Sequence, residues 1–242
     1  MLAWQDVVQR YRRSIIGQFW ITISMAITVL CLGFLFGALF KVPYKDFLPF
    51  LAMGLILWGL ISNTLTEAGA AFTNSTNIIR QIKLPGMVYV ARVVWRNLIV
   101  FAHNIVIIPL LFLAIGFPMG PELLLAIPGL LLVLANLLWM SYVLGVFCTR
   151  FRDLPQMVQS ALQIAFYVTP IIWMPNLLSG RAEAYLLGFN PFFHLIELVR
   201  APVLGQAPTL NNWLVGLGLL ALGWVVMVVL AKKFSHRIAY WL

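Results

Sequence analysis

Long apolar runs are the feature that most limits how this sequence can fold. About twenty apolar residues are what an α-helix needs to cross the hydrocarbon core of a membrane, and runs of roughly that length recur along the chain. Only 10% of the 242 residues are charged, whereas soluble domains carry about 25%. We therefore predict an all-α integral membrane protein with six transmembrane helices, at residues 20–40, 47–71, 93–117, 123–148, 157–174 and 213–231.

The segments outside these spans complete one transmembrane domain over residues 1–242. We expect an interface helix at 1–19, the six spans within 20–231 and a cytoplasmic tail at 232–242. Within 1–19, apolar residues recur at spacings of three and four opposite a basic face, the pattern of a helix that lies on a membrane surface. Because no small-residue cleavage site follows the first apolar run, we expect no cleavable signal peptide.

Two shorter helices are expected between the spans. The first lies within 74–84, before Pro85 and Gly86 break the connection between the second and third spans. The second lies within 190–200, where Pro191 stands at the favourable first helical position. Each of these short helices would lie in a connection, next to the end of a span.

Basic residues indicate the orientation of the chain. The connection at residues 73–96 carries four bases and no acid, and short loops rich in Lys and Arg stay in the cytoplasm. We therefore predict that both termini are cytoplasmic, on the side of Arg10, Arg12, Arg13, Arg80, Lys83, Arg92, Arg96, Arg150, Arg152, Lys232, Lys233 and Arg237. The opposite side would hold Lys41, Lys45, Arg181 and Arg200. Orientation explains the net charge of +9, so we do not predict nucleic-acid binding.

Several chemical functions are disfavoured by the residues present. None of the lysines follows a glycine, so the phosphate-binding loop of ATPases cannot form. The sequence also contains neither a Gly-x-Ser-x-Gly nor a His-Glu-x-x-His motif. The three histidines fall in different segments, and Cys31 and Cys148 form no metal-binding pair. We expect a chain that is not an enzyme and binds no metal or cofactor itself.

Polar side chains within the spans have two interpretations. Gln159, Gln163 and Tyr167 recur every four residues and therefore share one helix face. They would either join helices by hydrogen bonds or line a path for a polar substrate, and the same choice applies to Asn97, Asn104, Asn136 and Tyr142. We expect His103 to bond a neighbouring helix rather than to relay protons. We also expect Glu67 and Arg96 to form an ion pair across the second and third spans.

Four short patterns occur in a characteristic order. They are Asp6 with Arg10-Tyr11-Arg12, then Gly17 and Trp20; Ile82-Lys83-Leu84-Pro85; Arg152-Asp153-Leu154-Pro155 leading into Tyr167-Val168-Thr169-Pro170; and Asn190-Pro191 with Arg200 downstream. In this order the chain resembles the membrane subunits of ABC-2 type polysaccharide exporters, the O-antigen and teichoic-acid permease family. One departure is Gln5, which stands where the family pattern has an arginine.

The resemblance implies a specific assembly. Family members are homodimers with six helices per subunit around a central channel, and each subunit docks a separate cytoplasmic ATPase chain. Two such ATPase copies would bind ATP and Mg, and a lipid-linked polysaccharide would leave through the channel across the bacterial inner membrane.

The resemblance also implies roles for particular residues. Coupling to the ATPase would involve Asp6, Arg10, Arg12, Arg13, Asn77, Arg80 and Lys83. The substrate path would include Trp20, Gln163, Phe166, Tyr167 and Trp173. Short outer gate helices would lie between the fifth and sixth spans, in the segment 176–208 that holds Asn190, Pro191 and Arg200.

Two alternatives remain open. A drug or lipid exporter permease of the wider ABC-2 group would share the architecture and differ in its partner ATPase, which would lack a carbohydrate-binding extension. An integral membrane enzyme acting on lipid-linked sugars would need clustered acids or a metal site facing one aqueous side, and the sequence shows neither pattern.

Overall fold

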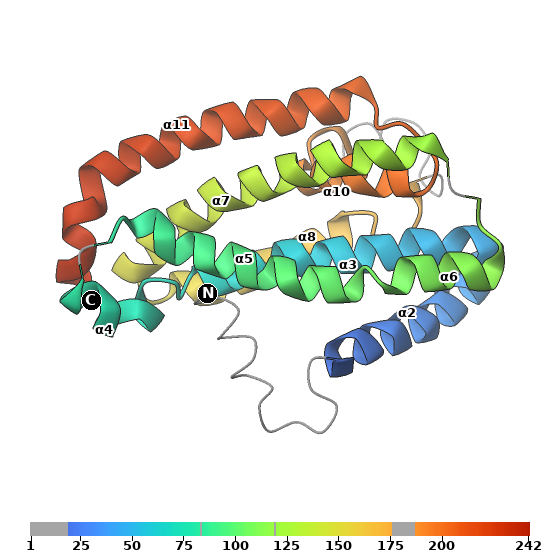
Figure 1. Ribbon diagram of the computed structural model, residues 1–242, viewed down its shortest axis with the longest axis horizontal. Coiled ribbons are helices and arrows are strands. Elements are labelled where there is room, and N and C mark those ends of the chain that lie inside the picture. Colours follow the sequence, from blue (N-terminus) through green and yellow to red (C-terminus); the bar gives the residue numbers. More distant parts are fainter. Residues whose placement is uncertain (1–18, 83, 119, 176–186) are drawn as a thin grey trace.

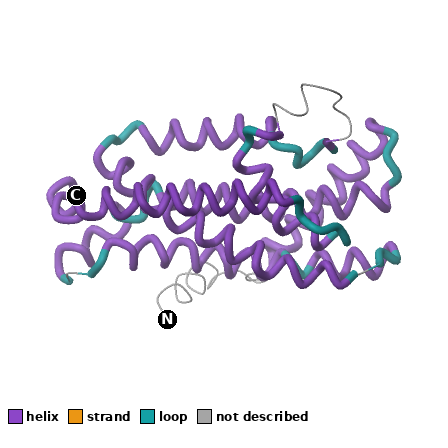
Figure 2. The backbone as a smooth tube through the Cα atoms, turned by 90° about the horizontal axis from the view of Figure 1, so that it is seen from above, coloured by secondary structure: helices purple, strands orange, loops and turns teal. Residues whose placement is uncertain are grey.

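A computed structural model describes residues 19–82, 84–118, 120–175 and 187–242 of the chain. Every regular element in these residues is a helix, and most helices run along the long axis of a single bundle (Figures 1 and 2). The all-α prediction is therefore confirmed for this part of the chain. The predicted interface helix lies outside the described residues, as do Asp6, Arg10, Arg12, Arg13 and Lys83.

The helices form a bundle with two distinct ends. In chain order they are α2 (Phe19–Phe40), α3 (Tyr44–Ala68), η1 (Thr73–Ser75), α4 (Thr76–Gln81), α5 (Gly86–Asn104), α6 (Ile107–Ile115), η2 (Pro121–Leu125), α7 (Ala126–Arg150), α8 (Leu154–Val168), α10 (Pro191–Val203) and α11 (Leu210–Trp241). One end, here the α4 end, carries α4 and the last turns of α11 (Figure 1). The other, here the far end, carries the turn between α2 and α3.

Five helical segments in the described part of the chain are long and apolar enough to cross a membrane. They are Phe19–Phe40, Tyr44–Ala68, Gly86–Ile115, Pro121–Arg150 and Leu210–Ile238. Because a lipid core offers no hydrogen bonds to an open backbone, helices of this length and composition are what a multi-pass membrane protein requires.

Helix α3 is the centre of the bundle. It packs against α2, α5, α7, α8 and α10, and 78% of its apolar window is buried, against 17% in α2 and in α11. A helix that is apolar on every side must be enclosed either by neighbouring helices or by lipid, and α3 is enclosed by helices. The outer faces of α2 and α11 instead remain exposed, as expected of surfaces that face lipid.

Two glycines set the close contact between α2 and α3. A Cβ atom added at Gly33 would overlap the Leu48 side chain, and one at Gly37 would lie 2.9 Å from a ring carbon of Tyr44. Small residues four apart allow two helices to approach closely where apolar burial gives little drive. The Gly33 and Gly37 pair therefore serves packing within the chain.

The third predicted span, at 93–117, corresponds to the segment Gly86–Ile115, which begins earlier than expected and has a short break between its two helices. Helix α5 begins at Gly86 and ends at Asn104, and α6 begins at Ile107. Pro109 has no backbone N–H, and its ring crowds the carbonyl four residues earlier. The Ile108 N–H accordingly donates to the Ile105 carbonyl at 3.0 Å, a tighter turn than in an α-helix.

The fifth predicted span, at 157–174, was expected to be bent or ended by Pro170 and Pro175, and in the structure its helix ends before Pro170. Helix α8 has 15 residues and is therefore about 22 Å long, less than the roughly 30 Å of a hydrocarbon core. Thr169 is extended at ψ 134°, because the residue before a proline is disfavoured in the helical region. The chain continues without a helix through Pro170 and Ile171, both buried.

The last helix is longer than expected. The sequence predicted a span over 213–231 and a tail over 232–242, whereas α11 continues to Trp241. At its start, the Thr209 hydroxyl accepts the Asn212 N–H at 3.4 Å. The basic residues Lys232, Lys233 and Arg237 therefore lie on a helix rather than in an irregular tail.

Asn136 joins α7 to α11, which supports the helix-joining interpretation of that residue. Its side-chain amide donates to the Gly216 carbonyl at 3.1 Å, and its side-chain oxygen accepts the Trp139 indole N–H at 2.9 Å. Trp139 in turn packs against Gly223, where a Cβ would overlap the indole ring. Trp224 adds a second cross-helix bond, from its indole N–H to the Ala135 carbonyl at 3.2 Å.

Candidate functional site

A groove of about 460 Å³ lies between α3 and α8. Every side chain that lines it comes from these two helices, and its lining combines aromatic rings with neutral polar groups: Trp58, Ser62, Thr66, Gln159, Leu162, Gln163 and Phe166. Leu162 is the one buried side chain of α8 and packs into the core beside α3. The remaining polar face of α8 is thereby held toward the groove.

Aromatic contacts fix the wall of this groove. The Trp58 ring lies 5.9 Å from Phe166, tilted by 47°, and 5.5 Å from Phe192 on α10, nearly edge-on at 82°. Such offset geometries are the favourable ones for aromatic pairs. Trp58 is only 8% exposed, so it links α3, α8 and α10 as a core residue and little of its ring reaches the groove.

The chemistry of the groove suits a polar, uncharged ligand. Amide and hydroxyl groups both donate and accept hydrogen bonds, and Gln159, Gln163 and Ser62 supply such groups. Aromatic faces pack against C–H groups at little cost in conformational entropy. No Asp, Glu, Lys or Arg lines the groove among the described residues, so strong ionic binding is not available there.

The structure brings together some of the residues predicted for the substrate path and separates others. Gln163 and Phe166 line the groove. The Tyr167 ring lies 5.4 Å from Phe166 and is 58% exposed, and the Tyr167 carbonyl accepts the Trp173 indole N–H at 3.1 Å. Trp20, near the start of α2, is 55% exposed and does not line this groove.

Three groove residues on α3 were not among the predicted path residues. Trp58, Ser62 and Thr66 follow one another at intervals of four, which places them on one helix face. The same spacing relates Gln159 to Gln163 on α8. A search for polar and aromatic residues repeating every four positions would have found both walls, but the sequence alone did not show that α3 and α8 face each other.

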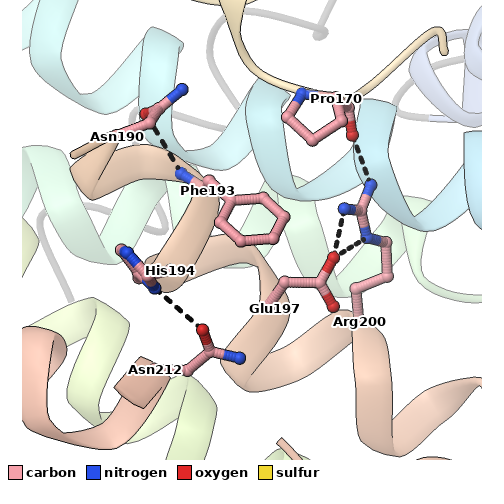
Figure 3. A network of polar contacts seen from close by, with 7 residues as sticks. All are labelled: Pro170, Asn190, Phe193, His194, Glu197, Arg200 and Asn212. Carbon is pink, nitrogen blue, oxygen red and sulfur yellow. Dashed lines mark hydrogen bonds and ion pairs between the residues drawn. The ribbon is translucent and has the colours of Figure 1, made fainter. Parts of the chain in front are cut away.

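A buried arginine organises the far end of the bundle (Figure 3). The side chain of Arg200, on α10, is fully buried and forms an ion pair with Glu197, one turn earlier on the same helix. Its Nη1 donates to the Pro170 carbonyl at 2.6 Å, and its guanidinium carbon lies 3.9 Å from the centre of the Phe50 ring on α3. Arg200 thus connects α10, α3 and the segment that follows α8.

Asn190 holds the other end of α10 to the same segment. Its side-chain oxygen accepts the N–H groups of Phe192 and Phe193 at 3.0 and 3.2 Å, which caps the helix, and Pro191 occupies the first helical position. The Asn190 side-chain amide donates to the Thr169 hydroxyl at 2.9 Å. Asn190 and Arg200, predicted to belong to an outer gate, therefore both contact the non-helical segment after α8.

His194 connects α10 to α11 within the same network (Figure 3). Its Nδ1 lies 2.8 Å from the Asn212 side-chain oxygen, and its Nε2 lies 3.0 Å from the Gly188 carbonyl. Together with the bonds of Asn190 and Arg200, this contact holds α10 against α3, α11 and the segment after α8.

At the α4 end, the predicted ion pair between Glu67 and Arg96 is confirmed. Arg96 Nη2 lies 2.6 Å from Glu67 Oε2, and Nε donates to the same oxygen at 3.2 Å. The Asn97 side-chain amide adds a third bond to it at 2.8 Å, so Asn97 also contributes to packing between α3 and α5. Of the other predicted coupling residues, Asn77 and Arg80 are exposed on α4, and Arg80 Nη2 donates to the Leu242 carbonyl at 3.0 Å.

Metal-binding side chains do not cluster in the described residues: no three of His, Cys, Asp and Glu lie close enough to hold an ion. His103 contacts its own helix, with Nδ1 2.7 Å from the Ile99 carbonyl, rather than the neighbouring helix that the sequence predicted.

Comparison with known proteins agrees with this architecture. The family model described as ABC-2 type transporter matches residues 1–204. Among similar proteins is the O-antigen export system permease protein RfbA of Myxococcus xanthus, 24% identical over 202 residues, or 83% of this chain and 77% of the relative.

Two Klebsiella pneumoniae proteins bear the same description. One is 23% identical over 195 residues, covering 79% of this chain and 74% of the relative. The other is 23% identical over 242 residues, covering 96% of this chain and 91% of the relative. Since the family model covers most of its length, this multi-pass helical chain belongs to the ABC-2 type transporter family.

Proposed function

We propose that this chain is the permease subunit of an ATP-driven exporter that moves a lipid-linked polysaccharide of the O-antigen or teichoic-acid type. The observation that carries the proposal is the groove between α3 and α8, whose rings and neutral amides suit an uncharged sugar chain. The names of the relatives, O-antigen export permeases, point to the same substrate class. In this proposal ATP hydrolysis resides in a separate partner chain, and the permease itself is a transport subunit.

The proposed assembly is a homodimer with two copies of a cytoplasmic ABC ATPase, which bind ATP and Mg. Six spans per subunit would result if α8 and the segment after it together make the fifth crossing, with gate helices between that crossing and α11.

The α4 end would face the cytoplasm of a bacterium, with both termini on that side of the inner membrane. The excess of bases supports this orientation: the α4 end carries Arg80, Arg92, Arg96, Arg150, Arg152, Lys232, Lys233 and Arg237.

The groove composition also favours movement of a long polymer over tight binding. Each sugar would meet a ring such as Phe166 and one or two amides such as Gln163. Individual contacts of this kind are worth about 1 kcal/mol, so successive sugars can exchange places. The nucleotide state of the ATPase would favour one arrangement of the helices over another, and the polymer would advance as the populations change.

The test is export in a bacterium whose own O-antigen permease gene has been deleted, complemented with this chain and its ATPase. Surface polysaccharide is measured after Thr66→Ala together with Gln163→Ala, one change on each wall of the groove and neither in the buried core. We expect at least a tenfold loss of surface polymer with normal amounts of the permease in the membrane. The matched control is Leu222→Ala with Val229→Ala, two changes on the exposed face of α11.

Normal export by the double groove variant would exclude this groove as the path. Export of small amphiphilic compounds without polymer, in the parent complex, would favour a drug or lipid exporter of the wider ABC-2 group.

A further inference from the structure

The last turns of α11 cover the connection that carries α4 (Figure 1). Ile238 lies in a second core cluster with Phe72 and Tyr89, and Phe234 and Trp241 pack against that cluster from α11. The α4 side chains of Ile78 and Ile79 pack on the same cluster. One apolar cluster is therefore shared by the end of α11, the start of α5 and α4.

Helix α4 depends on such contacts for its position. It has six residues and no buried side chain, and isolated helices shorter than about 12–15 residues are marginal in water. On its C-terminal side α4 ends at the extended Ile82, and α5 begins only after Pro85. The orientation of α4 must therefore come from what it packs against.

Apolar packing between α4 and α11 is incomplete. A cleft of about 440 Å³ remains between the two, lined by residues of the α4 connection such as Ile79 and Ile82 and by Ser235, His236 and Ile238 of α11. Close packing usually leaves few voids larger than a water molecule. A directional contact between the two helices would fix the distance of α4 from α11.

Arg80 supplies that contact. Its guanidinium donates from Nη2 to the Leu242 carbonyl at 3.0 Å, which joins α4 to the last residue of the chain described here. Trp241, next to Leu242, is itself held by the Arg150 guanidinium, whose central carbon lies 5.9 Å from its ring. The acceptor of the Arg80 bond is thereby tied to the end of α7.

We propose that α4 and the last turns of α11 form one docking unit for the ATPase, in which Arg80 is a positioning residue held by α11 rather than a direct contact to the partner. The inference rests on the proposed function, because it takes the partner to be an ATPase that docks at the α4 end. It adds α11 to the coupling machinery, and it assigns to Arg80 a partner within its own chain.

The experiment replaces the bond by a covalent link that lacks the guanidinium. The parent is the chain with Cys31→Ser and Cys148→Ala, which removes both native thiols. Arg80→Cys and Leu242→Cys are added, and the two thiols are joined with a short bis-maleimide reagent. A reagent is needed because cysteines at the ends of an arginine-length contact are too far apart for a disulfide.

The readout is the affinity of the permease, in nanodiscs, for the ATPase that co-purifies with it. We expect the unlinked double-cysteine variant to bind the ATPase about tenfold more weakly than the parent, with the ATPase's own KM for ATP unchanged. Closing the link should restore binding to within about twofold of the parent, because the position of α4 is recovered even though the guanidinium is absent.

Two results would overturn the proposal. If binding stays weak after the link closes, Arg80 contacts the ATPase directly. If the isolated chain does not cross-link in good yield, α4 and α11 do not adjoin as described. Cross-linking of the isolated chain requires no ATPase, so it tests the contact alone. If no ATPase binds even to the parent chain, the proposed function fails, whether or not the contact is present. Gln81→Cys with Leu242→Cys is the matched control for reagent specificity and should cross-link poorly, because Gln81 is likewise exposed but lies about 100° around α4 from Arg80.

Discussion

Two Arg–Glu ion pairs, at opposite ends of the bundle, differ in how completely they are enclosed. The Arg200 side chain is 0% exposed and Glu197 is 16% exposed, whereas Arg96 and Glu67 are 19% and 24% exposed. Arg200 also meets a backbone carbonyl and an aromatic face, and it connects three parts of the chain. The Glu67 pair joins α3 to α5 and remains partly open to water.

The difference shows that the contribution of an Arg–Glu ion pair to stability depends on how deeply the pair is buried. Charges removed from water are costly to separate, so a buried pair that loses one partner leaves the other uncompensated. Charges that keep contact with water are screened and lose little. The far end is therefore expected to be rigid, while the α4 end can rearrange, which suits an end that would follow the nucleotide state of a partner.

The largest expected effect is at Arg200. Arg200→Met should destabilise the chain by about 3–5 kcal/mol, because Glu197 and the Pro170 carbonyl lose their donor in a buried site. Thermal unfolding in detergent, followed by tryptophan fluorescence, measures the change. The double variant Glu197→Leu with Arg200→Met should recover at least half of the loss, since no unpaired charge then remains. A loss below about 1 kcal/mol for Arg200→Met would remove the contrast between the two ends.

A glycine tests the rigidity of the far end without changing any charge. A Cβ at Gly129, on α7, would overlap the backbone carbonyl of Leu198 on α10. Since backbone atoms cannot move aside as a side chain can, Gly129→Ala should cost about 1–3 kcal/mol in the same unfolding assay. Gly218→Ala on α11 is the matched control, because nothing lies within 4 Å of a Cβ there. Equal stability of the two variants would show that α10 shifts easily.

The smallest expected effect is at the Glu67 pair. Glu67→Gln should destabilise the chain by about 1 kcal/mol, between the value of an exposed pair and that of a buried hydrogen bond to a charge. We expect Glu67→Gln to reduce nucleotide-dependent export clearly, although the chain remains nearly as stable as the parent. The double variant Glu67→Arg with Arg96→Glu, which exchanges the two charges, should export more polymer than either single variant. Failure of the exchange to rescue either one would show that the pair itself is not what matters.

Spans, helical class and family membership were predictable from the sequence because each depends on local or whole-chain patterns. Apolar runs identified α2, α3, α7 and α11 to within a few residues at most ends. Pro85-Gly86 was correctly predicted to break the connection, although α5 begins at Gly86 rather than near residue 93. The Glu67–Arg96 pair was also predictable, since both residues stand where an inner loop meets a span and each would be costly alone.

Other features depended on contacts that no local pattern encodes. The shortness of α8 follows from Thr169 and Pro170, but a proline inside a span is often tolerated as a kink, so the sequence did not decide between a bend and an end. The extension of α11 to Trp241 depends on the cluster around Phe72 and Tyr89, far away in sequence. The groove likewise required knowledge that α8 packs on α3.

Arg200 has a consequence for the segment between Val168 and Pro175. Bare backbone inside a lipid-surrounded bundle is normally excluded because its carbonyls and N–H groups find no water. A guanidinium carries five N–H donors in a fixed plane, and Arg200 directs one of them at the Pro170 carbonyl while Asn190 serves the neighbouring Thr169 side chain. Arg200 thereby takes the place of water at one backbone carbonyl, and Asn190 holds the adjoining side chain, so this stretch can remain unwound inside the protein.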